Sequence, residues 1–490
     1  MPDLDITLDT RARHTLSRQL YEELRRLIVT GKIAPSQPLP ATRALSAELG
    51  IARATVVAAF NRLKQEGYVE GLDGSGTYVS NNLPEQPAKP IAEKETPLQI
   101  QVKRARLSTY AKHVLNFPGI EYSWTEPEIS FHGWRGALSV APVRQLSQAF
   151  ARAAKKFDPA LLDYAHEPLG YKPLREAIAR WLRKTRGIKC SEDQVIVLCG
   201  WRQAISLMAR IHLDRGDLVA IENPSYPGLR ESFELEGATV FSVPVDESGF
   251  LVDEVIESVD EQFRLVYLSP SHQNPIGVAL SLNRRVELLN WARRSGALIV
   301  EDEHDSEFQF GVGSIPALKG LDEQNQVIFL GSFYKTLFPS LGIAYLVLPD
   351  NLVEVYCRTR DFVGEHVPLL LQAMLADFMQ RGYLLRHVRK MHVLYAKRRQ
   401  ALMRSLEKHF GPRATVFGEE AGMHALVQFE TGLSETEIIY KAKTVGVGLV
   451  GTSRYYVGGP VHQAEFMLGY ADLTEQRIEE GIKRLASILL

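Results

Sequence analysis

Cysteine is scarce in this 490-residue chain, which has only three, at positions 190, 199 and 357. An odd number of widely spaced cysteines suggests neither a disulfide framework nor a zinc site, so we expect no metal. No apolar run approaches the roughly 18 residues that a membrane span requires. The first five residues lack the charged-then-apolar order of a signal peptide, so we expect a cytoplasmic protein with no membrane partner.

The chain also has almost no net charge, because its 57 Lys and Arg nearly balance its 58 Asp and Glu. The local balance is different, since residues 11–64 contain ten Lys or Arg against three Glu. Such asymmetry favours a polyanionic partner, although a solvated basic face would give the same composition. A chain of 490 residues is too long for one core, so several domains are expected.

The first eighty residues predict three short helices and a hairpin. Apolar residues recur at helical spacing over residues 17–30, then over 42–49 and 55–63. Residues 68–79 alternate around a glycine turn, which is typical of a β-hairpin. The order predicts a winged helix-turn-helix over residues 1–80, whose third helix can enter the major groove of DNA. A small helical interaction domain without DNA contact is the alternative.

Three short motifs sharpen this prediction. Residues 39–43 (Leu-Pro-Ala-Thr-Arg), 52–55 (Ala-Arg-Ala-Thr) and 74–76 (Gly-Ser-Gly) resemble the signature of GntR-type winged helices. The resemblance implies base or backbone contacts to DNA by the recognition helix and by the tip of the wing. The residues it assigns to DNA binding are Arg43, Arg53, Thr55, Gly74 and Gly76.

The rest of the chain predicts a linker and a larger domain. Residues 81–110 are rich in proline and charge and read as an extended connector, long enough to let the head dock on a neighbouring subunit. Residues 111–490 alternate helical and β-rich segments, which predicts βαβ units around a mainly parallel sheet over about 140–390. A long charged helix and a smaller α+β portion are expected over about 391–490.

Three polar residues stand at the ends of successive predicted strands. They are Asn274, Asp302 and Lys335, and ligands of open α/β sheets bind beyond such strand ends. A lysine, a carboxylate and an amide suit pyridoxal phosphate (PLP): the amine forms a Schiff base, the carboxylate keeps the pyridine nitrogen protonated, and the amide contacts the ring hydroxyl. Alone, they could be an exposed lysine, a helix cap and a turn, but together in this order they favour a cofactor site.

With these motifs, the C-terminal region resembles a fold-type I aminotransferase. With its GntR-like head, the whole chain resembles the MocR/GabR family of PLP-dependent transcriptional regulators. The resemblance implies that Lys335 is the residue that binds PLP covalently, and that Arg454 binds the carboxylate of an effector. The other cofactor contacts that it implies are Asn274, Asp302, Tyr226, His304, Ser332, Gly200, Trp201, Arg202 and, across a dimer, Tyr164.

Three positions depart from the family pattern. Relatives usually carry a phosphate-binding arginine seven residues after the lysine, where this chain has Gly342. Arg202 could replace that arginine, or it could point outward on its helix. His304 stands where a tyrosine is common, and Asn274 stands where regulators often have an aromatic residue.

The expected function is a PLP-responsive, homodimeric transcriptional regulator that binds double-stranded operator DNA, with a linker that permits exchanged heads. A small amino-group effector would displace Lys335 and form an external aldimine, so we expect sensing rather than turnover. One alternative is an active PLP-dependent aminotransferase with an appended DNA-binding domain, which Asn274 favours. Another is a regulator that has lost PLP and binds a different ligand in the same pocket.

Overall fold

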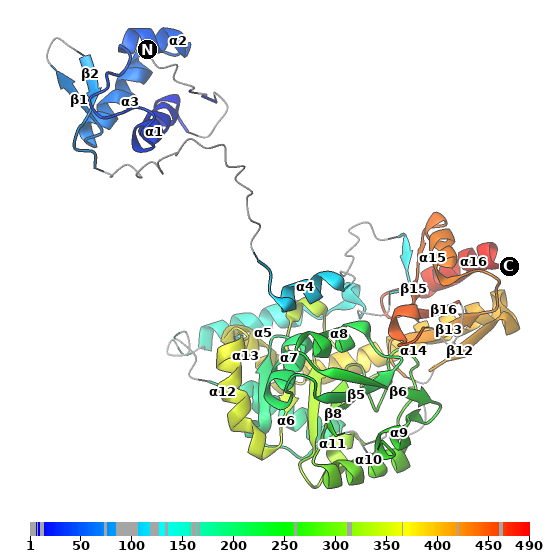
Figure 1. The fold of residues 1–490 in the computed structure, drawn as a ribbon. Coiled ribbons are helices and arrows are strands. Elements are labelled where there is room, and N and C mark those ends of the chain that lie inside the picture. Colours follow the sequence, from blue (N-terminus) through cyan, green and yellow to red (C-terminus); the bar gives the residue numbers. More distant parts are fainter. Residues whose placement is uncertain are drawn as a thin grey trace. The chain divides into compact units, whose positions relative to one another are not determined.

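The computed structural model describes residues 6, 8–9, 14–72, 76–84, 106–117, 127–132, 136–156, 158, 163, 167–258, 262–310, 316–364, 366–418, 421–459 and 464–490. The chain divides into two compact units, Met1–Ala105 and Arg106–Leu490 (Figure 1). Within the described ranges, every helix is too short or too polar to span a lipid bilayer. Much of the predicted linker falls outside these ranges, so its boundaries at 81 and 110 stay a prediction.

The N-terminal unit has the predicted three helices followed by a hairpin. Its elements are α1 (Leu16–Val29), α2 (Thr42–Glu48), α3 (Arg53–Gln65), β1 (Val69–Leu72) and β2 (Gly76–Val79). The two strands pair antiparallel, with Val69 opposite Val79. Leu20, Leu24 and Leu63 are completely buried in one cluster to which α1 and α3 both contribute. The amphipathic spacing of the sequence therefore does form the core of a small winged-helix domain.

The C-terminal unit is built on an eight-stranded sheet with the order β4-β11-β10-β9-β8-β5-β6-β7. The strands are β4 (Val195–Leu198), β5 (Leu218–Asn223), β6 (Thr239–Asp246), β7 (Gly249–Phe250), β8 (Phe263–Leu268), β9 (Leu298–Glu303), β10 (Val327–Ser332) and β11 (Ala344–Val347). The neighbours from β10 to β6 pair parallel, whereas β11 and β7 run antiparallel to the strands beside them. The predicted mainly parallel sheet is confirmed.

Helices cover both faces of this sheet (Figure 1). They are α5 (Val143–Lys156), α6 (Lys172–Thr185), α7 (Trp201–His212), α8 (Pro227–Leu235), α9 (Val252–Ile256), α10 (Leu282–Ser295), α11 (Leu318–Leu321), α12 (Val353–Val363) and α13 (Leu369–Gln380), and α4 (Thr109–Asn116) precedes them. Along β10, Ile328 and Leu330 pack in one hydrophobic cluster, and Val327 and Phe329 pack in others. Since neighbouring side chains of a strand point to opposite faces, both faces of the sheet are buried.

A smaller portion follows the long helix α14 (Tyr383–His409). Its antiparallel sheet contains β12 (Ala414–Phe417), β13 (His424–Phe429), β16 (Glu465–Gly469) and β15 (Val450–Gly451), and its helices are α15 (Glu435–Thr444) and α16 (Glu475–Leu489). A segment that precedes the large part joins it, because β3 (Ile129–Ser130) pairs with β14 (Val447–Gly448). Phe131 also packs on α16 at Gly481, where an added Cβ would lie 2.6 Å from the ring.

Replacing Leu24 with alanine should destabilise the N-terminal unit by about 2–5 kcal/mol, because the change leaves a cavity in a fully packed core. Calorimetry of the full-length protein should show a lower melting temperature for the transition of that unit alone. Leu402→Ala, which changes an equally buried leucine of α14, is the control and should lower the other transition. If either variant lowered the melting temperatures of both transitions equally, the two units would not fold separately.

Candidate cofactor site and DNA-binding surface

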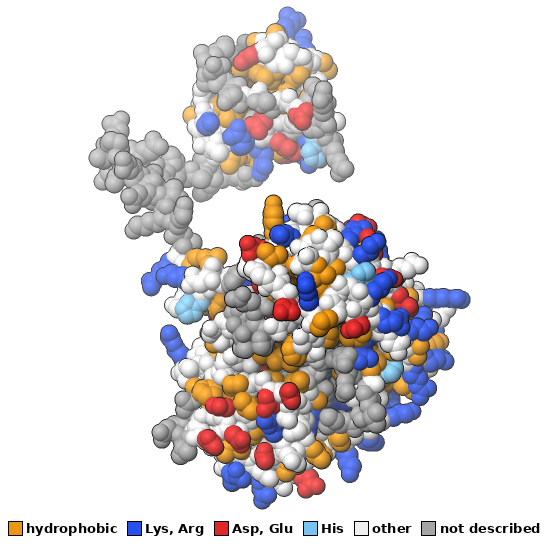
Figure 2. All heavy atoms as spheres, turned by 90° about the vertical axis from the view of Figure 1, so that its right-hand side faces the viewer, with side chains coloured by type: hydrophobic (Ala, Val, Ile, Leu, Met, Phe, Trp, Pro, Cys, Tyr) orange, Lys and Arg blue, Asp and Glu red, His pale blue; other side chains and the backbone are white. Residues whose placement is uncertain are grey.

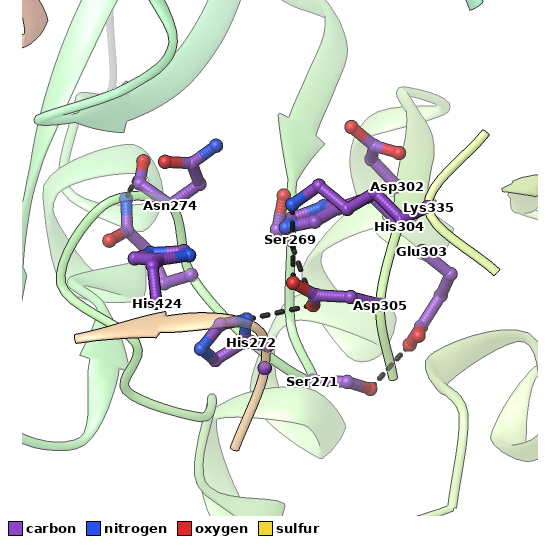
Figure 3. Close-up of polar contacts among 12 residues, drawn as sticks. Ser269, Ser271, His272, Asn274, Asp302, Glu303, His304, Asp305, Lys335 and His424 are labelled. Carbon is purple, nitrogen blue, oxygen red and sulfur yellow. Dashed lines mark hydrogen bonds and ion pairs between the residues drawn. The ribbon is translucent and has the colours of Figure 1, made fainter. Parts of the chain in front are cut away.

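Adjacent strands place the three predicted cofactor residues at one edge of the sheet. Asn274 follows β8, Asp302 lies near the end of β9, and Lys335 follows β10. These three strands are neighbours and pair parallel, with Asp302 opposite Leu330 of β10. The carboxyl ends therefore meet, and Figure 3 shows the three side chains in one region.

Asp302 and its neighbour Glu303 point to opposite faces of β9, as alternation along a strand requires. The Tyr267 hydroxyl donates a hydrogen bond to Asp302 Oδ2 at 2.8 Å. Glu303 instead accepts hydrogen bonds from Arg186, at 2.6 Å, and from Ser271. Burial raises the pKa of Asp302 to about 6, although the Tyr267 hydrogen bond and the charge of Lys335 oppose the rise. Because Asp302 lies inside a strand, it is not a helix cap.

Lys335 is not a surface lysine, since only 11% of its side chain is exposed. Its Nζ donates a hydrogen bond to Asp305 Oδ2 at 3.1 Å, and His272 Nδ1 lies 2.8 Å from Asp305 Oδ1 (Figure 3). Burial favours the neutral form of Asp305, but the neighbouring His272 and Lys335 hold its pKa well below the usual range. Asp305 is therefore a buried carboxylate with partners on both oxygens.

No sequence pattern pointed to Asp305, His272 or a third buried side chain, His424. In the sequence Asp305 is one of several acidic residues close together, and the turn after β9 that brings it back to the site has no periodic pattern. The sequence signal for Asp305 was its position three residues after Asp302, just beyond the end of a predicted strand. The His272 and His424 rings lie 5.3 Å apart between centroids, although the two residues come from distant segments of the chain.

Several buried polar atoms at this edge have no hydrogen-bond partner among the described residues. They are Asn274 Oδ1, His304 Nε2 and His272 Nε2. Burial, aided by the charge of Lys335, lowers the pKa of His304 to about 3, so its ring is neutral. Since buried polar groups normally find partners, the Asn274 and His304 atoms suit a ligand with a polar ring. Together with the lysine and the carboxylate they fit PLP, whose ring hydroxyl can donate to Asn274 Oδ1.

The predicted phosphate turn has the backbone of an anion site. Gly200, with a φ of +82°, precedes α7, and unpaired N–H groups at a helix N-terminus attract anions. Ser332 ends β10 and is partly exposed. Arg202 is exposed, with its guanidinium 4.7 Å from the centre of the Trp201 ring, so its contact with phosphate stays a prediction. Gly342 has a left-handed backbone, φ +63°, and nothing lies within 4 Å of a Cβ added there.

The loops that carry the predicted ring-stacking and effector residues are joined. Tyr226 packs edge-to-face against Trp201, with 5.5 Å between ring centroids. Next to Tyr226, the Ser225 amide donates to the Tyr455 carbonyl at 3.0 Å, and Tyr455 follows Arg454 directly. Arg454 therefore lies on a segment of the small portion that is hydrogen-bonded to the loop of Tyr226.

Arg454 remains accessible to a ligand. Its side chain is 54% exposed, and its guanidinium lies 3.6 Å from the Glu231 carboxylate, a weak ion pair at such exposure. Two other predicted residues, Tyr164 and Gly74, lie outside the described residues, and their roles stay predictions.

Arg43 and Arg53 are exposed in α2 and at the start of α3, and neither has a carboxylate partner within the described part of the chain. Arg53 donates to Thr42 Oγ1 at 3.3 Å. By contrast, the other helix arginines largely pair with glutamates: Arg18 with Glu22, Arg26 with Glu23, and Arg62 with Glu66. Thr55 is partly buried on α3, and Gly76 begins β2 with a φ of +115°. On the face of the C-terminal unit in Figure 2, acidic, basic and apolar side chains are interspersed.

Comparison with known proteins matches the N-terminal and the C-terminal part of the chain to two different families. Residues 16–79 match the gntR family of bacterial regulatory proteins, and residues 143–485 match the class I and II aminotransferases. Over 487 residues the chain is 34% identical to the probable rhizopine catabolism regulatory protein MocR of Rhizobium meliloti, covering 99% of this chain and 96% of that protein. The chain belongs to the MocR family of transcriptional regulators.

Another regulator is similar over most of the chain, and solved aminotransferase structures are similar to its C-terminal part. The pyridoxine biosynthesis transcriptional regulator PdxR of Corynebacterium glutamicum is 29% identical, over 94% of this chain and 92% of that protein. A multiple substrate aminotransferase from Thermococcus profundus superposes with a TM-score of 0.71 at 27% identity, covering 78% of this chain and 97% of that one. The aminotransferase LysN of Thermus thermophilus, complexed with N-(5'-phosphopyridoxyl)-L-leucine, gives 0.67 at 29%, covering 73% and 91%. The predicted family and fold are confirmed.

Asp302→Asn should stabilise the cofactor-free MocR-type protein at pH 8. The folded-state pKa of about 6 lies above the ordinary 3.8, so the folded state loses stability as pH rises through this window. A shift of about two units corresponds to ~3 kcal/mol. The amide carries no charge and still accepts from Tyr267, so the melting temperature should exceed that of the wild type at pH 8 and approach it below pH 4.

Asp246→Asn is the matched control for this experiment. The Asp246 pKa is lowered by its hydrogen bond to Arg284, so this change should slightly lower the melting temperature at pH 8. A melting temperature of Asp302→Asn at or below that of the wild type at pH 8 would contradict the raised pKa.

Proposed function

We propose that this regulator binds PLP through Lys335 and uses it to sense a small molecule that carries an amino group. The supporting observation is that Lys335, Asp302 and Asn274 meet at the ends of adjacent strands, in a chain that also has a winged-helix unit. When bound, PLP supplies an aldehyde that a primary amine can attack. The amines in question would be those of Lys335 and of the effector.

The residues of this chain would hold the coenzyme in place. The Asp302 carboxylate would accept a charge-assisted hydrogen bond from the pyridine nitrogen, and such bonds are about twice as strong as neutral ones. Tyr226 would cover one face of the ring, and Ser332 and the Gly200 turn would hold the phosphate. Gly342 stands where relatives usually have a phosphate-binding arginine, so this chain lacks a charged hydrogen bond worth about 1.5–3 kcal/mol. Its affinity for PLP should therefore be lower than that of relatives with the arginine.

Effector binding would be coupled to DNA through the Arg454 segment. An effector carboxylate would pair with Arg454, whose loop is bonded to the Tyr226 loop through Ser225 and Tyr455. A ligand shifts a conformational equilibrium only if it binds the two arrangements with different affinity. An effector that contacts both the large and the small part of the domain would bind two arrangements of these parts with different affinity.

We further propose a homodimer that binds operator DNA in the cytoplasm. Support comes from α4, which buries none of its residues. The exposed apolar side chains on and before it are Leu107, Tyr110, Val114 and Leu115. Exposed apolar groups gathered on one element mark interaction surfaces. Two heads of a dimer would read half-sites spaced by multiples of a DNA turn, and the linker is long enough for exchanged heads.

An active aminotransferase with an appended DNA-binding domain is the second candidate. It is favoured by Asn274 and by the structural similarity to aminotransferases at 26–29% identity. Turnover of an amino acid with a keto acid would support the enzyme. An amino ligand that stays covalently bound to the coenzyme would support the sensor.

Borohydride reduction of the full-length protein with excess PLP should label Lys335 and no other lysine, because reduction traps a lysine–coenzyme bond. Peptide mass spectrometry identifies the labelled position. The Lys335→Ala variant is the control and should stay unlabelled. An unlabelled Lys335 in a folded wild-type preparation would overturn the proposed sensing mechanism and favour a regulator that uses another ligand.

Arg53→Ala should weaken operator binding by about 5- to 150-fold, since a bidentate arginine–guanine pair contributes about 1–3 kcal/mol. Fluorescence anisotropy with the upstream intergenic DNA at fixed salt measures the change. Arg18→Ala removes the same charge from α1, where Arg18 is paired with Glu22 at 2.9 Å, and should change affinity little. Equal effects of the two variants would argue against Arg53 in the groove.

A further inference from the structure

Asp305 is a fully enclosed carboxylate next to Lys335. Its side chain is 0% exposed, yet its pKa is held well below the usual range. A buried charge is tolerated only when it is paired and hydrogen-bonded. The pairing comes from Lys335 on one oxygen and His272 on the other, at 3.1 and 2.8 Å.

The protein makes room for His272 to hold Asp305. Gly422 lies against the His272 ring, with a φ of +80°, and a Cβ added there would lie 2.0 Å from His272 Cε1. His424, the first residue of β13, lies next to the same ring, with 5.3 Å between the two ring centroids. His272 can thus fix Oδ1 of Asp305 and leave Oδ2 directed at the lysine.

We propose that Asp305, oriented by His272, is the docking carboxylate that receives the Lys335 amine when an amino ligand takes its place on the coenzyme. This inference rests on the proposed function. In the exchange, the ligand nitrogen would form the double bond to the coenzyme's aldehyde carbon as the double bond from that carbon to Nζ breaks. Protons of the incoming ammonium would pass to Nζ, so the lysine leaves as an ammonium and no other reactant is needed.

The released lysine is then an ammonium in a largely buried place, and its stability decides how easily a ligand displaces it. Asp305 stabilises the released state through a charge-assisted hydrogen bond. His272 acts only through Asp305, so both are positioning residues. The carboxylate therefore sets the ligand concentration at which the sensor responds, without touching the ligand.

The same side chains could suggest a metal site, because ligand atoms of His272, His304 and Asp305 lie within 4.8 Å of one another. The Lys335 ammonium 3.1 Å from Asp305 opposes a second cation at this place. The charge arrangement therefore favours a lysine dock over a metal ion.

The test measures ligand exchange in the PLP-loaded full-length protein. Methylamine is the probe because it has no carboxylate for Arg454, and the coenzyme absorbance reports the concentration for half exchange. Asp305→Asn should raise that concentration about tenfold to a hundredfold, as expected for the loss of a hydrogen bond between charged groups. Retention of PLP on Lys335 should be unchanged or stronger, a split that general damage to the fold would not produce.

Asp322→Asn is the matched control. Asp322 forms a buried pair with Lys319, also at 3.1 Å, and it lies at the opposite end of β10, where it accepts a hydrogen bond from the Val327 amide. This variant should leave the methylamine constant as in the wild type. If it shifts the constant as much as Asp305→Asn does, the proposal is overturned.

His272 supplies a second, independent pair of variants. His272→Asn keeps a nitrogen donor near the position of Nδ1 and should stay close to the wild type, whereas His272→Leu should raise the constant. These variants decide the question if Asp305→Asn does not fold. A methylamine constant unaffected by both Asp305→Asn and His272→Leu, with Lys335 still labelled by borohydride, would overturn this inference alone. An unlabelled wild type would overturn the proposed function as well.

Discussion

The parallel pairing of β8, β9 and β10 is the constraint on which the candidate site depends. Parallel neighbours end at the same edge of a sheet, so residues far apart in sequence are brought together by backbone hydrogen bonds alone. Asn274, Asp302 and Lys335 meet for this reason. The helices that bury both faces of the sheet hold this edge in place, because the strands' apolar residues alternate between clusters on the two sides.

The two aspartates at this edge have opposite electrostatics. Burial raises the pKa of Asp302 to about 6, whereas partners on both oxygens keep the pKa of Asp305 well below its usual range. Burial disfavours the charged form of Asp302, so this carboxylate suits a protonated ring nitrogen. Asp305 is already satisfied by Lys335 and His272. Groups with perturbed pKa values that lie close together are typical of functional sites.

Periodicity predicted most of the fold. The spacing of apolar residues was enough for the winged-helix unit and for the alternation of strands and helices, since both patterns are local. The joining of β3 to β14 was not predicted, because these short strands have no pattern of their own and lie far apart in the chain. The accessibility of Arg202 was left open for a related reason: a helical residue next to a turn can face either way until its neighbours are placed.

The sequence by itself determined the two-part organisation, the helix and strand order, and the residue types that PLP and DNA require, because these depend on local spacing and on motifs. Only the tertiary structure decided that Asp305 and His272 flank Lys335 and that the Arg454 loop is bonded to the Tyr226 loop. The physical reason is that these contacts come from strand register and from turns between elements. Such long-range packing leaves no periodic signal in the chain.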